Sequence, residues 1–200
     1  MKNTLSLLAA AALLTACAVQ QAPSPSGDIR TPAAFAQWRG QHEAEVAAYE
    51  SFLKAEDLQG LVPMHELLRS ASDWQKCEAQ PFAVPPQAQW KDVASVLRLV
   101  KTLKADDMLG PFEMHSGYRN PELNQCAGGA ARSAHLRAFA MDITPVDAAT
   151  LPKLCAFWRE QGPALSMGLG QYPSGRIHID TLGHRTWGRD GSFKTSPCLD

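Results

Sequence analysis

The chain has 200 residues, of which 45% are hydrophobic and 20% are charged, and its formal net charge is −1. This composition is typical of one globular domain and excludes a disordered or collagen-like chain. The near-neutral charge gives no electrostatic reason to expect nucleic acid or an anionic membrane as a partner.

The first 17 residues are typical of an export signal. A positive charge precedes an apolar run over 5–14, which has the length of a signal-peptide core but is too short to span a bilayer. The sequence LTAC that ends at Cys17 resembles the lipobox of bacterial lipoproteins. The resemblance implies a lipoprotein signal peptide over 1–16 and an acylated Cys17. In such lipoproteins Ala18 in place of Asp favours the outer membrane, so we expect an exported protein on the periplasmic side. The alternative is an ordinary cleaved signal in which Cys17 has no role.

The remaining sequence is divided into a tether and a folded part. Residues 17–33 begin with the cysteine and are rich in Pro, Ser and Gln, which predicts a flexible tether and leaves 34–200 as one domain. Apolar residues at helical spacing then predict helices in chain order over 35–52, 62–70, 90–103 and 148–160. Prolines between the second and third of these helices predict an extended loop.

Short apolar runs predict the strands, which lie mostly in the second half of the chain, over 113–116, 139–144, 165–171 and 175–180. A turn at Tyr172-Pro173-Ser174 separates the last two strands and implies an antiparallel hairpin. We therefore expect an α+β fold, in which helices mainly from the N-terminal half pack on an antiparallel sheet.

Four cysteines remain besides the proposed lipidation site: Cys77, Cys126, Cys155 and Cys198. An even number in an exported chain predicts two disulfides. Three pairings are possible, and we favour Cys77–Cys126 together with Cys155–Cys198. A zinc cluster built from these residues is not favoured, because no CxxC spacing is present.

Two segments place metal-binding side chains within apolar strands. Asp142 interrupts the strand over 139–144, and a buried carboxylate needs a cation, a donor or a metal. In the last strand, the period of two puts His178 and Asp180 on one face and two isoleucines on the other. With His135 the chain offers two imidazoles and a carboxylate, the open ligand set of a catalytic zinc. Taken singly, each residue also has a structural explanation: His135 as a surface or satisfied histidine, Asp142 as a strand-end cap, and His178 as a core histidine.

Four motifs in order resemble those of the zinc D-alanyl-D-alanine peptidases, which form one superfamily with lysostaphin-type endopeptidases and the hedgehog N-terminal domain. They are SGYRNP from Ser116, SAHLRAFAMD from Ser133 (family pattern SxHxxGxAxD), GLGQYP from Gly168, and IHID from Ile177 with the following Trp187-Gly188. The last two are most similar to small periplasmic murein peptidases. The resemblance covers about residues 112–188, whereas 34–110 carries no motif that we identify.

The resemblance implies a role for five residues. His135, Asp142 and His178 would bind Zn²⁺, which lowers the pKa of a bound water and polarises the scissile carbonyl. Arg119 would hold a substrate carboxylate or carbonyl and act in catalysis, and Ser133 would bind substrate or position the site. The alternatives are a surface salt bridge for Arg119 and a turn for Ser133.

The chain departs from the family pattern at two positions. Ala138 replaces the usual Gly, and Gly175 stands where the family has a Glu, three residues before the last histidine ligand. A different group must then be the general base. We nominate Asp180 as this base. An interpretation that we weight equally is that Asp180 orients a ligand histidine instead. His184 and Glu113 are weaker candidates.

The sequence therefore predicts a lipid-anchored zinc peptidase that cleaves a D-amino-acid bond in peptidoglycan stem peptides, as a D,D-carboxypeptidase or an endopeptidase. The alternative is a non-catalytic, zinc-containing peptidoglycan-binding lipoprotein, which Gly175 favours. A disulfide-stabilised inhibitor or adaptor, in which the motifs are coincidental, is a third interpretation. The expected partners are stem peptides and, through Cys17, a membrane, and no nucleic acid.

Overall fold

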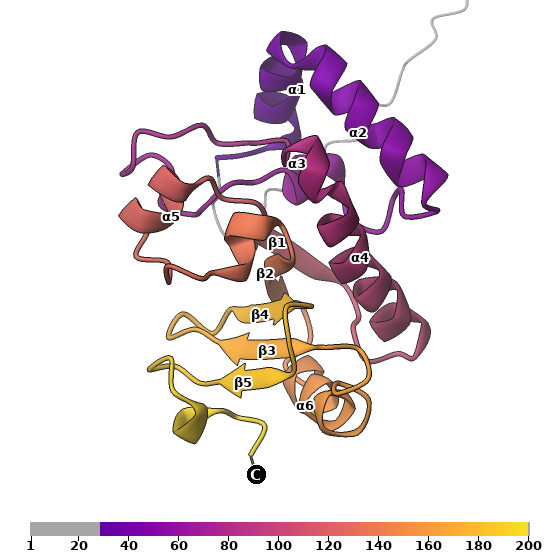
Figure 1. The fold of residues 1–200 in the computed structure, drawn as a ribbon, viewed down its shortest axis with the longest axis vertical. Coiled ribbons are helices and arrows are strands. Elements are labelled where there is room, and N and C mark those ends of the chain that lie inside the picture. The colour runs from indigo at the N-terminus through magenta and orange to yellow at the C-terminus, as the bar shows by residue number, and fades with distance from the viewer. Residues whose placement is uncertain (1–28, 200) are drawn as a thin grey trace, which may run out of the picture.

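The computed structural model describes residues 29–199, which are built around a five-stranded sheet (Figure 1). Its strands are β1 (Phe112–Ser116), β2 (Ala140–Pro145), β3 (Gly168–Gln171), β4 (Ile177–Asp180) and β5 (Arg185–Trp187), in the order β1-β2-β4-β3-β5. The proposed signal peptide, Cys17 and most of the tether lie outside the described residues. Within the described part, no helix combines the length and apolar character needed to cross a membrane.

The sheet is mixed, so the expectation of a purely antiparallel sheet is wrong at one edge. β1, β2, β4 and β3 pair antiparallel, but β5 runs parallel to β3. Both edges of β4 are already paired, with β2 and with β3, so the chain that returns after β4 pairs with the outer edge of β3. Because β5 reverses the direction of β4, it runs in the same direction as β3.

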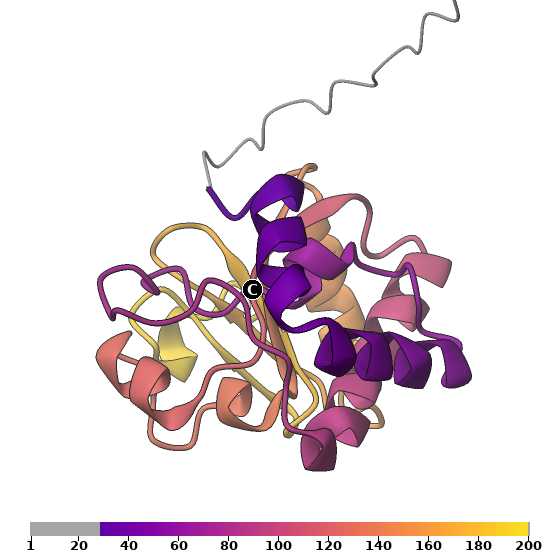
Figure 2. The same ribbon diagram turned by 90° about the horizontal axis from the view of Figure 1, so that it is seen from above.

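The two faces of the sheet differ in chemistry, because successive strand residues point to opposite sides. The helices α4 (Trp90–Ala105) and α6 (Thr150–Glu160) lie on one side of the sheet in both views (Figures 1 and 2). The buried strand residues of the apolar core are Met114, Met141, Ile143, Leu169, Ile177 and Ile179. The helix α5 (Pro121–Cys126) and the 3₁₀ helix η2 (Ala134–Arg137) lie on the other side (Figure 2). The buried polar strand residues Asp142 and His178 are directly opposite each other in the register and belong to this second face.

The helix predicted over 35–52 is two helices, α1 (Pro32–Gln41) and α2 (Glu43–Ala55), which meet at His42. The backbone N–H of His42 bonds to the carbonyl of Arg39 instead of that of Trp38. The Trp38 carbonyl accepts a bond of 2.9 Å from Nδ1 of the same histidine, whose ring stacks on the indole at 4.1 Å. This side-chain bond replaces the helical one and ends α1.

The other predicted helices differ mainly in length. Those over 90–103 and 148–160 are confirmed as α4 and α6. The helix over 62–70 shortens to α3 (Met64–Leu67), because Arg69 pairs with Phe82 in an isolated β-bridge. α5 was not predicted; the side chain of Asn120 caps it by accepting from the N–H of Leu123 at 2.8 Å. The short 3₁₀ helices η1 (Gln87–Gln89) and η3 (Phe193–Thr195) complete the fold.

Both disulfides of the favoured pairing are confirmed, Cys77–Cys126 and Cys155–Cys198. The first joins the loop before Pro81 to the end of α5, and the second joins α6 to the C-terminal segment. The bonded residues are 49 and 43 positions apart. In the chain-entropy model, loops of this length correspond to about 4 kcal/mol of stabilisation each.

Candidate metal centre

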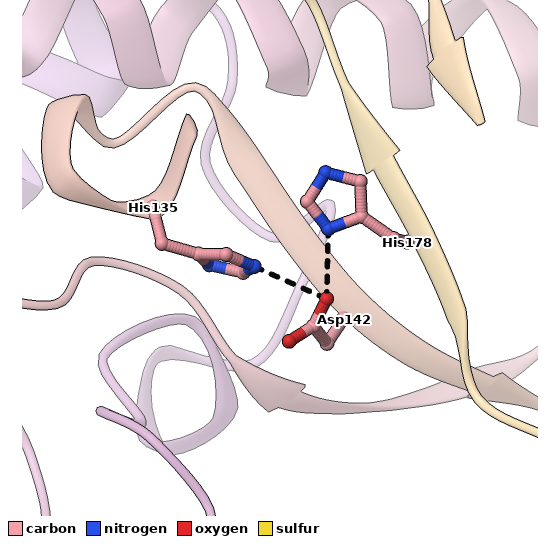
Figure 3. Close-up of side chains that lie close together, drawn as sticks. All are labelled: His135, Asp142 and His178. Carbon is pink, nitrogen blue, oxygen red and sulfur yellow. Dashed lines mark hydrogen bonds and ion pairs between the residues drawn. The ribbon is translucent and has the colours of Figure 1, made fainter. Parts of the chain in front are cut away.

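Three buried side chains from different elements meet on the polar face of the sheet (Figure 3). His135 belongs to η2, whereas Asp142 on β2 and His178 on β4 are directly opposite each other in the strand register. His135 Nε2 and His178 Nδ1 lie 3.1 and 3.0 Å from the same Asp142 Oδ1. The three ligand atoms lie within 4.8 Å of one another, a spacing that one metal ion can bridge.

Hydrogen bonds on the outer nitrogens orient both imidazoles. Nδ1 of His135 faces the carbonyl oxygen of Gly117 at 2.7 Å and carries the proton, because a carbonyl only accepts. Nε2 of His178 faces Oδ2 of Asp180 at 2.8 Å and is the donor for the same reason. In the neutral rings, the inner lone pairs therefore both point at the Asp142 carboxylate. A bound cation satisfies this arrangement of three acceptors.

Burial and charge act in opposite directions on the ionisable groups of the cluster. Burial raises the pKa of Asp142, but His135, His178 and Arg119 outweigh it and hold that pKa well below its ordinary value. Burial lowers the pKa of His135, and Arg119 adds to this effect. Burial also acts to lower the pKa of His178, but its bonds to Asp142 and Asp180 raise it overall. Asp142 is therefore ionised, as a metal ligand has to be.

Asp180 lies at Nε2 of the His178 ring, whereas Asp142 lies at Nδ1 on the opposite side of the ring. Its side chain is fully buried, and Arg185 donates to both of its carboxylate oxygens, at 2.9 and 2.7 Å. This geometry favours the interpretation that Asp180 orients His178 over the interpretation that it is the general base. Gly168 is directly opposite in β3, and a Cβ there would lie 2.2 Å from Asp180 Oδ2.

Arg119 follows β1 and is held against the triad. Its backbone N–H donates to the carbonyl of His135 at 3.0 Å, its Nε donates to Ser116 Oγ at 2.8 Å, and its Nη2 donates to Asp142. The side chain is only 11% exposed, so a surface salt bridge is the wrong interpretation. Ser133 caps η2 by accepting from the N–H of His135 at 3.3 Å, as the turn interpretation predicted. A role of either residue toward substrate stays a prediction.

The two weaker candidates for the base are engaged elsewhere. Glu113 forms an ion pair of 2.8 Å with Arg69. His184 stacks on Trp158 at 4.4 Å, and its Nε2 bonds to the carbonyl of the same residue at 3.2 Å. Neither side chain lines the pockets beside the triad, so the geometry does not support either as a base.

Two pockets adjoin the triad. One, of about 330 Å³, is lined by Asp142 and also by Asp73 from the loop before the first disulfide. The other, of about 440 Å³, is lined by His135 and His178. Arg119 and Tyr172 line both pockets and stand between them, so the triad can be reached from two sides.

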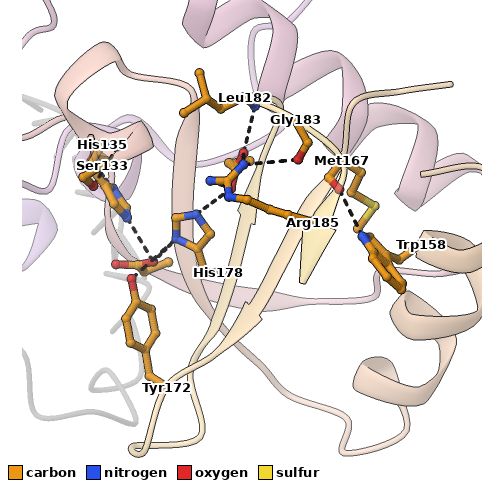
Figure 4. A network of polar contacts seen from close by, with 12 residues as sticks. Ser133, His135, Trp158, Met167, Tyr172, His178, Leu182, Gly183 and Arg185 are labelled. Carbon is orange, nitrogen blue, oxygen red and sulfur yellow. Dashed lines mark hydrogen bonds and ion pairs between the residues drawn. The ribbon is translucent and has the colours of Figure 1, made fainter. Parts of the chain in front are cut away.

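Three residues around His178 were not identified as site residues from the sequence. The Tyr172 hydroxyl lies 3.5 Å from His178 Nδ1 (Figure 4). Burial raises the pKa of this hydroxyl, which therefore keeps its proton. The ring of Trp187 lies 4.9 Å from the Tyr172 ring and 5.5 Å from the His178 ring. Both aromatic residues stand in the quoted motifs, which was the available signal. Arg185 had no such signal, because β5 was not predicted.

The substitution at Ala138 falls on a special backbone conformation. This residue follows η2 with a φ of +58°, in the left-handed region that glycine adopts more readily. The turn returns the chain from His135 to β2 and so to Asp142. A glycine in the family pattern suits this turn, and the alanine here is accommodated in it.

A buried His-Asp-His triad beside two pockets can hold a metal ion that a substrate can reach, as a metal-dependent hydrolase requires. The chain belongs to the Peptidase M15 family, whose model matches residues 62–180, and it is therefore of metallopeptidase type. This match confirms the resemblance, overturns the interpretation of coincidental motifs, and begins upstream of the motifs, at residue 62. No curated protein and no solved structure matches the chain.

Proposed function

We propose that this chain is a zinc-dependent peptidase that cleaves a D-amino-acid bond in peptidoglycan stem peptides. The observation that carries the proposal is the convergence of two pre-oriented imidazoles and one carboxylate between two pockets. The family supports a metallopeptidase. The resemblance of the last two motifs to murein peptidases supports the choice of substrate.

The donor set fits a zinc ion. Two imidazole nitrogens and a carboxylate oxygen are ligands that Zn²⁺ accepts, and three protein ligands leave a fourth position open. His135, Asp142 and His178 would hold the ion. When bound, zinc supplies a Lewis acid for the scissile carbonyl and a water of lowered pKa.

Other residues of the site would position the substrate. Arg119 stands between the two pockets, and its guanidinium would orient the substrate on either side of the scissile bond. The Tyr172 hydroxyl keeps its proton and would donate it in a hydrogen bond to a substrate oxygen. Ser133 would add a hydroxyl from the pocket that His135 and His178 line.

Asp73 is our candidate for the proton acceptor. Gly175 has a φ of +85° in the turn between β3 and β4 and offers no side chain. Among the residues that line the two pockets, the carboxylates are those of Asp142 and Asp73, and Asp142 would be a ligand. Asp73 is exposed and would take a proton from the attacking water and pass it to the leaving amine.

We also propose export and lipidation at Cys17, which would hold the enzyme at the periplasmic face of the outer membrane. The described chain is fixed near its start by Arg30, which is buried and donates to the carbonyls of Ala71 and His115 at 3.2 and 3.0 Å. The segment between Cys17 and Arg30 spans at most roughly 45 Å. Loss of the protein from the membrane fraction in Cys17→Ser tests the anchor, and retention would contradict it.

A non-catalytic, zinc-containing peptidoglycan-binding lipoprotein is the second candidate, and the absence of a side chain at Gly175 favours it. The deciding experiment incubates the purified protein with muropeptides, with and without a chelator, and analyses the products by chromatography and mass spectrometry. We expect products that disappear with the chelator and in His178→Ala. Released D-alanine would indicate a carboxypeptidase, and cleaved dimers an endopeptidase. Binding without any product would support the second candidate.

A further inference from the structure

The pocket that His135 and His178 line has a strongly positive lining, and we name it the arginine pocket. Its arginines are Arg119, Arg132, Arg185 and Arg189, and no aspartate or glutamate lines it. Two of them are engaged, because Arg119 binds Asp142 and Arg185 binds Asp180. The other two have no acidic partner in the pocket.

Arg132 and Arg189 are exposed, and within the described range 29–199 neither side chain forms a hydrogen bond or an ion pair. They belong to separate segments, one before η2 and one after β5, so their approach to one pocket is a property of the fold. The carboxylate nearest in sequence, Asp190, bonds instead to Ser192 and Thr195. The positive charges of Arg132 and Arg189 are therefore not neutralised by neighbouring residues.

The remaining lining of the arginine pocket suits an extended peptide. One wall, residues 127–130, carries nothing larger than a methyl group, so a peptide backbone can approach it closely. At Gly129 a Cβ would lie 2.1 Å from Oδ1 of Asn124, and the Nδ2 of that side chain donates to the carbonyl of Ala130 at 3.0 Å. Because Asn124 is held in this position, a larger side chain at residue 129 would collide with it. Ser133 and Trp187 add a hydroxyl and an aromatic face.

We infer that Arg132 and Arg189 bind a carboxylate of the substrate while the scissile bond lies at the triad. A guanidinium presents a fork of donors that matches a carboxylate, and a pocket without acidic groups favours an anion. This inference rests on the proposed function and deepens it. The carboxylate is either the C-terminal one of the stem peptide or one of its side-chain carboxylates, since both offer the same chemistry.

The test uses the zinc-loaded mature protein and three synthetic stem pentapeptides that end in D-alanyl-D-alanine. One peptide has all carboxylates free, one is amidated at its C-terminus, and one is amidated at its side chains. We expect the double variant Arg132→Gln/Arg189→Gln to raise KM for the free peptide by about tenfold to a hundredfold with kcat unchanged. Amidation of the recognised carboxylate should raise the wild-type KM similarly and remove the difference between the proteins.

The matched control is Arg137→Gln, because Arg137 is an exposed arginine of η2 that does not line the arginine pocket. Its KM should equal that of the wild type. The dissociation constant of each peptide, measured by calorimetry, separates the inference from the proposed function. If peptide binding weakens in the double variant but the wild type cleaves no peptide, the result would support the arginine site and contradict the proposed peptidase activity. Equal affinities of wild type and double variant for all three peptides would overturn the inference, as would absence of binding to the wild type.

Discussion

At the scale of single residues, the candidate site depends on hydrogen bonds made outside the metal position. His135 is fixed by the carbonyl of Gly117, and His178 by Asp180, which Arg185 holds in turn. Such outer partners set the tautomer and the direction of each ring. The site is therefore sensitive to substitutions that leave the three proposed ligands unchanged.

Replacing Asp180 with Asn distinguishes the two interpretations of this residue. If Asp180 orients His178, Asp180→Asn should weaken Zn²⁺ affinity by about 10- to 100-fold, because the carboxylate that polarises the imidazole is lost. Competition with a chromophoric chelator measures this affinity. Asp106→Asn, an exposed position after α4, should not change it. Unchanged zinc binding with lost activity would instead indicate that Asp180 is the base.

Asp73 permits the complementary test. Asp73→Asn should lower kcat by about 10²- to 10⁴-fold, because the proton acceptor is removed, and should leave zinc affinity unchanged. Glu78→Gln is the control, since Glu78 is exposed in the same loop but lines neither pocket of the site. Full activity of Asp73→Asn in steady-state kinetics would rule out this role.

At the scale of elements, local sequence patterns predict the features that neighbouring residues determine, such as which face of a strand a side chain occupies. They miss the features that depend on which strands pair. The period of two correctly puts His178 and Asp180 on one face of β4, and the motif order identifies the triad. β5 has only three residues, and its partner is decided by which strand edge remains open, which no local pattern contains. Arg185 is missed for this reason. Asp73, which lines a pocket beside the triad, is missed because its loop carries none of the motifs.

Gly168 shows how closely β3 and β4 fit around the site. Gly168→Ala would place a methyl group against the Asp180 carboxylate, so we expect the free energy of unfolding to fall by about 1–3 kcal/mol. Denaturant unfolding measures the change. Gly110→Ala serves as the control, because a Cβ at Gly110 meets no atom within 4 Å. Equal stability of both variants would show that the strands separate without cost.

At the scale of the whole molecule, the two disulfides stabilise the same fold but act on different regions. Cys77–Cys126 joins the loop of Asp73 to the segment at Ala127, and both of these residues line a pocket of the site. Cys155–Cys198 joins α6 to the C-terminal segment, away from both pockets. One bond therefore holds walls of the site, and the other holds the fold alone.

Removing each disulfide separates these contributions. Cys77→Ser/Cys126→Ser and Cys155→Ser/Cys198→Ser should each lower the free energy of unfolding by about 4 kcal/mol, since the closed loops are similar in length. Only the first pair should also raise KM for a stem peptide, because it releases the pocket walls. A KM that rises equally in both double variants would contradict this assignment.

In the function that we propose, His135, Asp142 and His178 together hold one zinc ion. The most direct measurement is a crystal structure of the zinc-loaded protein with anomalous diffraction recorded at the zinc edge. We predict one peak between these side chains, with His135 Nε2, His178 Nδ1 and an Asp142 oxygen each about 2.0–2.2 Å from the ion. Zinc bound elsewhere in the protein, or no peak between these three side chains, would contradict this assignment of the zinc ligands.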